Sequence, residues 1–394
     1  MTKQNITYLI GAGASCQALP LVKDFRKESY FAQVIFQSVP TGPVKPDDLN
    51  PIDAVIKLLG VNQNLFEKLI KSDDFEEDLE KLKVDFANDL KWMKEACLEH
   101  ATIDTFAKKL YLTRNRPENL QNYQRLKNTL SAYFMWEQFL KPPDKRYDTF
   151  FASIAHNKDG GEIKLPSNIK VISWNYDFQF EKSYSKYYKS QDISEVQSYE
   201  ALNCFPNLKI AYTDNRPYKS DKFSIVKLNG TAGLHRSGDK TIEDLVEEQM
   251  WYTNDSKGLR EASRKILKFI ELYKAQESKA QSLLSFAWER ESNMGLHKHY
   301  NTVSEANKIA IETDILVIIG YSFPFFNREI DREIFESLIN RPGSMLQKIY
   351  YQAPAQDVDF LEQRLTSIIG KESNYLIEMR TDIEDFFIPP QFSF

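Results

Sequence analysis

The segment Ile6-Thr-Tyr-Leu-Ile-Gly-Ala-Gly-Ala-Ser15 decides the fold, because a short apolar run passes directly into a loop that contains two glycines. Ile6–Ile10 is rich in β-branched and aromatic residues, which is typical of a buried strand. The glycines allow the backbone to approach a phosphate closely, and a helix that begins there supplies amide donors and a partial positive charge. The segment therefore predicts a strand, a ligand-binding loop and a short helix before or around Pro20.

Glycine is scarce in this chain, with 14 among 394 residues, so the pair Gly11 and Gly13 carries information. A dinucleotide-binding loop has Gly or Ala three positions after its second glycine, where this chain has Cys16. No clear second strand follows to carry the acidic residue that this fingerprint places ~20 residues later. The loop disfavours a hydride-transferring dehydrogenase, and by itself it indicates either a nucleotide site or a tight turn.

Three more apolar runs end in polar or glycine residues, as Ile6–Ile10 does. These runs and the residues at their ends are Ile169–Trp174 with Asn175 and Asp177, Phe223–Leu228 with Asn229 and Gly230, and Ile315–Gly320 with Tyr321 and Ser322. Ligands of open α/β sheets bind at the carboxyl ends of the strands. Each end is also compatible with an ordinary turn, such as an Asx turn at Asn175–Asp177. Four such ends in a glycine-poor chain favour a shared binding site.

Helical patterns alternate with these strands along the chain. From about 52 to 145, apolar residues recur every three to four positions, and helices are expected again at about 257–312, 327–340 and 355–369. Two more strands are expected at Leu208–Tyr212 and Lys348–Gln352. Because several strands are apolar without alternation, both faces of their sheet should be covered. The sequence predicts an α/β protein with a Rossmann-like parallel sheet covered by helices and with large helical insertions.

The predicted sheet and insertions divide the chain into two parts. Residues 1–45 and 149–394 form a core domain with a helical excursion at about 240–312, and residues 46–148 form a helical insertion. Four prolines within 38–52 mark the irregular connection to this insertion. Asp73–Glu99, with ten acidic and four basic residues, is either a docking surface or a solvated helix face.

Composition and charge exclude several classes of protein. The net charge of −5 argues against a surface that coats nucleic acid, although a local basic groove stays open. No apolar run approaches the ~20 residues of a membrane span, and the N-terminus leaves no room for a signal peptide, so a cytoplasmic location is expected. With three cysteines and one close histidine pair, His297 and His299, no metal site is expected.

Four segments resemble motifs of the sirtuin-like (silent information regulator) family, and they are most similar to those of bacterial NAD-degrading effectors of anti-phage defence. The segments are Gly11–Ser15 with Leu19-Pro20, Trp174–Asp177, Lys227–Gly230 and Ile319–Pro324. The resemblance implies that NAD is the substrate, that Asn175 lies against the nicotinamide ribose and positions the attacking water, and that Asp177 orients the loop. The NAD-binding residues that it implies are Gly11, Ala12, Gly13, Ala14 and Ser15 at the pyrophosphate, Gly320 and Ser322 at the adenosine end, and Tyr321 and Gly230.

One position departs from this family. The chain has Asn229 where the family has a histidine that assists as a base at the ribose, and an asparagine side chain takes up no proton at neutral pH. His235 is either its substitute or an ordinary loop histidine. Since the nicotinamide–ribose bond breaks through an oxocarbenium-like state with a good leaving group, positioning and electrostatics can carry much of the barrier. Asn229 and His235 thus join Asn175 and Asp177 as catalytic candidates.

The resemblance implies a function, and the departure leaves an alternative. The implied function is an NAD glycohydrolase that depletes NAD in anti-phage defence (abortive infection) when it is activated in a complex. The alternative is a weakly active or inactive subunit that binds NAD or another nucleotide, whereas three cysteines oppose a sirtuin-type deacetylase, whose zinc module uses four. Because unrestrained loss of NAD kills the host, we expect a homo-oligomer controlled by an operon-encoded partner, either a HerA-like ATPase or a nucleotide-sensing protein. No direct contact with nucleic acid is expected.

Overall fold

The structure is a computed structural model of the chain. It describes residues 3–19, 76–100, 102–157, 163–190, 192–207, 221–233, 235–237, 240–241, 280–292, 300–340, 342 and 344–392. Residues 20–75, which include the proline-rich connection at 38–52 and the start of the predicted insertion, lie outside the described residues. So do the strand expected at Leu208–Tyr212 and residues 242–279 and 293–299 of the expected helical excursion.

The centre of the protein is a seven-stranded sheet with the order β12-β11-β10-β1-β4-β6-β5, in which neighbouring strands are parallel. The strands are β1 (Ile6–Ile10), β4 (Ile169–Ser173), β5 (Cys204–Phe205), β6 (Ser224–Lys227), β10 (Ile315–Ile319), β11 (Lys348–Gln352) and β12 (Ile377–Arg380). The predicted Rossmann-like parallel sheet is confirmed. Because the chain extends from β1 to β4 and later returns to β10 on the other side of β1, the switch point of the sheet lies beside β1.

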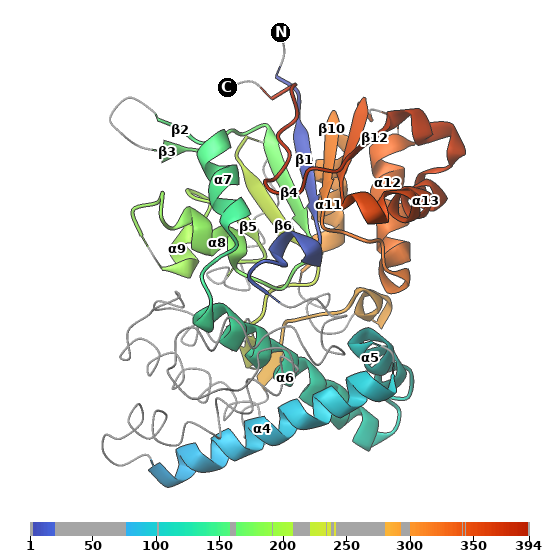
Figure 1. The fold of residues 1–394 in the computed structure, drawn as a ribbon. Helices are drawn as coiled ribbons and strands as arrows, with labels where there is room; N and C mark the ends of the chain where they lie inside the picture. Colours follow the sequence, from blue (N-terminus) through green and yellow to red (C-terminus); the bar gives the residue numbers. More distant parts are fainter. Residues whose placement is uncertain are drawn as a thin grey trace.

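Helices cover both faces of this sheet, as Figure 1 shows. They are α7 (Lys145–Ile154), α8 (Gln179–Tyr184), α9 (Ile193–Val196), α11 (Thr302–Ile311), α12 (Arg328–Ile339) and α13 (Val358–Ile369). Tyr8 and Val317 face a core that contains α7 and α8, whereas Leu9 and Ile318 face a second core that contains α11, α12 and α13. Burial on both faces explains why the strand sequences are apolar without interruption.

A helical module lies beyond the end of the sheet at which the strands finish (Figure 1). It consists of α4 (Glu76–Glu99), α5 (Ile103–Leu112) and α6 (Pro117–Leu140). The stripes predicted from the sequence are buried, with Leu90 and Met93 on α4 and Leu126 and Leu130 on α6. These side chains belong to the same core as Leu9 of β1, so the module shares its packing with the sheet. The described part of the predicted insertion is helical, as expected.

Several shorter elements complete the chain. They are the hairpin β2 (His156–Asn157) and β3 (Ile163–Lys164), the antiparallel sheet of β7 (His235–Ser237), β8 (Lys240–Thr241) and β9 (Ala280–Ser282), and the 3₁₀ helices η1 (Ala12–Ser15), η4 (Ala287–Ser292), η6 (Phe325–Asn327), η7 (Ala355–Asp357) and η8 (Lys371–Leu376). The prediction of a helix at about 257–312 is therefore wrong at 280–282, where pairing of β9 with β7 overrides the local sequence pattern. It is confirmed at α11.

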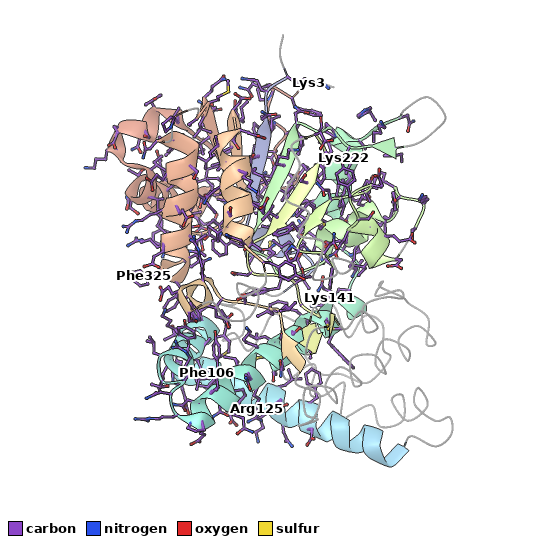
Figure 2. The ribbon with its side chains drawn as sticks, turned by 180° about the vertical axis from the view of Figure 1, so that it is seen from behind. Lys3, Phe106, Arg125, Lys141, Lys222 and Phe325 are labelled. Carbon is purple, nitrogen blue, oxygen red and sulfur yellow. The ribbon has the colours of Figure 1, made fainter. Side chains whose placement is uncertain are left out.

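Figure 2 relates the module to the sheet. Phe106 and Arg125 lie in the helical module, Lys3 and Lys222 lie at the far end of the sheet, and Lys141 and Phe325 lie between them. Lys141 follows the last residue of α6. The junction of α6 and α7 is thus next to the end of the sheet at which the candidate residues are expected. Among the helices that the structure describes, none combines the length and the apolar character that a bilayer crossing requires.

Candidate functional site

The loop after β1 packs directly on the loop after β10. The Gly11 amide donates to Ile319 O at 3.0 Å and the Gly13 amide donates to Gly320 O at 2.8 Å. Gly320 has a φ of +63°, and a Cβ atom there would lie 2.0 Å from the Ala14 nitrogen. A Cβ atom on Gly11 would lie 2.6 Å from Gly320 O. These glycines therefore permit a close backbone contact at the switch point of the sheet.

Most amides of this loop are occupied by protein acceptors. The Ala14 amide donates to Gly11 O at 2.9 Å and the Cys16 amide donates to Gly13 O, in addition to the two bonds toward β10. The amide of Ala12, an exposed residue at the start of η1, donates to no acceptor within the described ranges. The loop thus offers a ligand few free donors in this conformation, and its side chains become the more informative part.

Ser15 is the centre of a buried cluster of side chains. Its Oγ lies 2.7 Å from Asp177 Oδ2, 2.8 Å from Tyr147 OH and 3.2 Å from Asn175 Nδ2. Since the Ser15 hydroxyl has one proton, which it donates to Asp177, the other two groups donate to it. Burial raises the pKa of Asp177 above its usual value, whereas the Lys227 ammonium and the bond from Ser15 lower it. The cluster holds a carboxyl group, a hydroxyl and an amide in fixed positions.

Asn175 joins the loops after β4 and β1. Its Nδ2 donates to Gly11 O at 3.1 Å as well as to Ser15, and its backbone amide donates to Ser173 Oγ at 3.1 Å. The side chain is 7% exposed, and its Oδ1 accepts from none of the described residues. Gly11–Ser15, Asn175 and Asp177, which the sequence places far apart, are therefore brought together at the carboxyl edge of the sheet, as the pattern of strand ends predicts.

The loop after β6 lies against the loop after β4. Ala232 N donates to Tyr176 O and Ser285 N donates to Asn229 O, at 2.8 and 2.9 Å. Gly230, between the two, has a φ of +73°. Asn229 Oδ1 and Thr231 Oγ1 are buried without a hydrogen-bond partner in the described part of the chain. A buried polar atom of this kind costs stability unless something outside the protein satisfies it, so both atoms are candidates for contact with a ligand or with water.

Tyr321 has a structural environment. Its ring stacks on Trp174 with the centroids 5.8 Å apart, and its hydroxyl donates to the Asp331 carboxylate at 2.8–2.9 Å. Ser322 is exposed, and its carbonyl accepts a bond from Arg364 at 2.7 Å. Neither side chain joins the cluster around Ser15. Their contact with NAD stays a prediction.

His235 opens β7, but its side chain lies outside the described part of the structure. The hypothesis that it replaces the family histidine therefore stays a prediction. Two histidine side chains are described, and both are elsewhere. His100 packs on Phe106 in the helical module, and His156 is exposed in β2.

Buried charges lie next to the cluster. Lys227 Nζ donates to Asp177 O at 2.8 Å and to Glu181 Oε1 at 2.6 Å. Lys182 donates to the carbonyls of Gln138 and Lys141 at the end of α6. Burial lowers the pKa of Lys182 to about 7, although Asp177 raises it. Lys227 of β6 therefore holds the loop after β4, and Lys182 ties α8 to the end of α6.

Sequence reasoning also missed contacts from α7 and β6. Arg146 and Tyr147 lie in the first turn of α7 and contact the loop after β1, and no motif marks them. Thr231 directly follows the predicted Asn229-Gly230 pair. Extending the set of candidate residues by one position after this strand would have included it. Within the ranges that the structure describes, no group of three or more His, Cys, Asp or Glu side chains is placed to hold a metal ion.

No family model matches the chain, and comparisons with curated proteins and with solved structures find no similar protein. The sirtuin-like resemblance therefore depends on the four sequence motifs alone. The α/β fold and the cluster at the carboxyl edge of the sheet are observed in the structure and do not depend on similarity to another protein.

Proposed function

We propose that this protein is an NAD glycohydrolase, which cleaves the bond between nicotinamide and ribose. The observation that carries the proposal is the hydrogen-bonded cluster of Ser15, Asn175 and Asp177, because segments about 160 residues apart meet there. This edge of a parallel sheet, beside its switch point, is where α/β proteins bind nucleotides. The motif resemblance supplies the substrate, and the cluster supplies groups that suit its chemistry.

In the proposed reaction, water attacks C1′ of the nicotinamide ribose. The bond from C1′ to the pyridinium nitrogen breaks, its electron pair leaves with neutral nicotinamide, and the proton from water passes to solvent. Asn175 Oδ1 accepts a bond from the water and orients it. The Asp177 carboxyl, held by Ser15 and Gln179 N, stabilises the positive charge that develops on the ribose. Asn229 Oδ1 and Thr231 Oγ1 accept bonds from ribose hydroxyls.

The test compares two asparagines of the same strand. Asn175 follows the carboxyl end of β4, and Asn168 precedes its amino end, where Nδ2 donates to Gln4 O at 2.7 Å. Both are 7% exposed. With NAD as the probe and free nicotinamide as the readout, Asn175→Ala should lower turnover by about 100-fold or more, since misplaced reacting groups cost that much. Asn168→Ala should keep turnover within about twofold. Equal turnover of the two variants contradicts the assignment.

A second candidate is an inactive subunit that binds NAD or another nucleotide. Asn229 favours it, because no described histidine side chain at this edge replaces the family base. Calorimetry with NAD separates the two candidates: binding without nicotinamide release, alone and with the products of neighbouring genes, supports the inactive subunit.

The proposal includes control by assembly. An enzyme that depletes NAD has to be silent at rest, so we expect a homo-oligomer that becomes active in a complex with an ATPase of the HerA type or a nucleotide-sensing protein, in the cytoplasm. Size-exclusion chromatography with light scattering, combined with the nicotinamide assay, tests this part. A fully active monomer without a partner contradicts it.

A further inference from the structure

The first turn of α7 contacts the loop after β1 through two side chains. Arg146 Nη2 donates to Gly13 O at 3.2 Å and to Ala14 O at 3.0 Å. Tyr147 OH donates to Ser15 Oγ at 2.8 Å. One segment of α7 therefore bonds both to the backbone of this loop and to the side chain at the centre of the polar cluster.

Arg146 is itself fixed by a carboxylate. Its Nε and Nη2 donate to the two oxygens of Asp144 at 3.0 and 2.7 Å, and Asp144 Oδ2 also accepts from Gln17 N at 3.1 Å. Both charged side chains are buried, so the ion pair is stable only while each keeps its full set of partners. A planar guanidinium can form the paired bonds with a carboxylate and still reach two carbonyls, whereas the ammonium of lysine cannot.

The same junction also holds the loop after β4. Gln138 Oε1 accepts from Phe178 N at 2.5 Å, and Asp144 N donates to Gln179 Oε1 at 2.7 Å. Lys182 Nζ donates to Lys141 O at 3.1 Å. Residues 138–147, which we call the α6–α7 junction, thus bond to both loops of the candidate site and continue directly into the helical module.

We propose that Arg146 is a positioning residue, which holds Gly13–Ser15 in the shape that binds the substrate, and that the α6–α7 junction transmits the position of the helical module to the site. A partner that moves α6 would then change the loop without touching it. The expected change in KM for NAD rests on the proposed function, whereas the expected change in how often the loop opens does not.

Cys16 provides a probe of the loop that is independent of NAD. Its Sγ lies 3.5 Å from Arg146 Nη2, and it is partly exposed, whereas the other two cysteines, Cys97 and Cys204, are buried. The rate at which iodoacetamide alkylates Cys16 in the native protein, followed by mass spectrometry, reports how often the loop opens. Arg146→Lys should raise this rate about fivefold or more, which is the change expected from the loss of one hydrogen bond.

Arg125→Lys is the matched control, because Arg125 also pairs with an aspartate, Asp89, but lies in the helical module (Figure 2). It should leave the Cys16 rate unchanged. Tyr147→Phe removes only the hydroxyl that bonds to Ser15, so it tests the same junction if Arg146→Lys does not fold. Its control is Tyr187→Phe, whose hydroxyl bonds to Asp148 of α7 instead. An unchanged Cys16 rate in both Arg146→Lys and Tyr147→Phe overturns the proposal.

The kinetic arm distinguishes positioning from folding. A residue that only stabilises the protein lowers kcat through the amount of active enzyme and leaves KM for NAD unchanged, whereas a positioning residue at the loop raises KM. Tyr147→Phe should raise KM about fivefold, and Tyr187→Phe should not. An unchanged KM together with faster Cys16 alkylation overturns the positioning role. If the wild type neither binds nor hydrolyses NAD, the proposed function fails, and the alkylation rates alone decide whether the junction holds the loop.

Discussion

The central sheet has two edges at which its parallel strands begin and end, the amino edge and the carboxyl edge, and polar groups are arranged differently at each. At the amino edge, polar groups complete the backbone ladder: Asn5 N donates to Asp314 Oδ2 at 2.7 Å, Asn5 O accepts from the amides of Asp314 and Ile315, and Asn168 Nδ2 donates to Gln4 O. At the carboxyl edge, side chains bond to one another, with Ser15 in contact with three of them. The first arrangement satisfies strand ends that would otherwise lack partners, and the second fixes the relative positions of polar side chains.

This difference indicates which edge carries function. Backbone groups at a strand end need partners in any fold, so the amino edge requires no ligand to explain it. A cluster of buried side chains costs desolvation and is retained where the geometry of the groups matters. The carboxyl edge also has the tight contact between Gly11 and Gly320, which only glycine permits. Paired substitutions, one at each edge or one in each loop, therefore separate function from stability.

The largest effect is expected for Gly320→Ala. The new Cβ would overlap with the Ala14 backbone at 2.0 Å, and the residue would keep a φ of +63°, so the loops after β1 and β10 have to separate. We expect a loss of more than about 3 kcal/mol in the free energy of unfolding, measured by urea denaturation.

Gly370→Ala is its control at the end of α13. Its φ is +85°, but the new Cβ would meet only the Glu372 side chain, which can rotate away. The expected loss is about 2 kcal/mol from backbone strain alone, because a φ of +85° with a ψ of 153° is a conformation that essentially only glycine adopts. Losses of equal size would show that the contact between the two loops adds nothing to the stability.

A smaller effect, confined to activity, is expected for Asp177→Asn. The amide that replaces the carboxylate keeps the size of the side chain but removes the negative charge next to Ser15, so NAD turnover should fall about 10- to 100-fold. Asp314→Asn at the amino edge, where the carboxylate accepts from Asn5 N, should change turnover less than about twofold. Nicotinamide release at saturating NAD is the measurement. Similar losses in both variants would contradict the assignment of function to one edge.

The sequence was sufficient to predict that residues after β1 and β4 meet, because parallel strands end at the same edge of a sheet. The apolar runs at Ile6–Ile10, Ile169–Trp174 and Ile315–Gly320 predicted three strands, and the polar side chains after the first two meet. The side chains of Tyr321 and Ser322, which follow the third, do not join them. The small strands β5 and β9 were missed, since two or three residues carry no periodic signal and form through pairing with neighbours.

The contacts from α7 to the site were beyond sequence reasoning. Arg146 and Tyr147 reach Ala14 and Ser15, which precede them by more than 130 residues, only because α7 packs on the sheet beside β1. Its amphipathic pattern predicts which face is buried but not which loop its first turn will meet. The sequence pattern therefore predicted the residues of the cluster that directly follow a strand. The residues contributed by α7 follow no strand, and only tertiary packing brings them to the cluster.

Two buried lysines, Lys170 in β4 and Lys182 in α8, should give the stability of the protein a pH dependence. Burial lowers the pKa of Lys182, next to the carboxyl edge, to about 7, and that of Lys170, at the amino end of β4, to about 8. The unfolded chain binds more protons than the folded chain between these values and the unfolded pKa of about 10.4. The free energy of unfolding should therefore rise with pH in this window.

From pH 7 to pH 9, Lys182 should contribute about 2 kcal/mol to this rise and Lys170 about 1 kcal/mol. Lys182→Met and Lys170→Met each remove one contribution, and urea denaturation at the two pH values measures it. The variant at position 182 should lose the larger part of the rise. If it keeps the full rise, Lys182 is charged in the folded protein at pH 9.

The smallest effect is expected for two hydroxyls of the first strand and its loop. Thr7 Oγ1 bonds to Thr313 Oγ1 at 2.7 Å at the amino edge, whereas Ser15 Oγ bonds to Asp177 at the carboxyl edge. Thr7→Val removes one buried hydrogen bond and should lower the free energy of unfolding by about 1 kcal/mol, whereas Ser15→Ala removes three and should lower it by about 2 kcal/mol or more. Only Ser15→Ala frees the Asn175 amide and the Asp177 carboxyl, so only this variant should also weaken NAD binding, by about fivefold in calorimetry. Affinity is compared at a temperature at which urea denaturation shows both variants to be fully folded, so a difference in affinity cannot arise from partial unfolding. An equal loss of affinity in both would mean that the two edges of the sheet are energetically coupled, and that the cluster at the carboxyl edge is not a separate binding site.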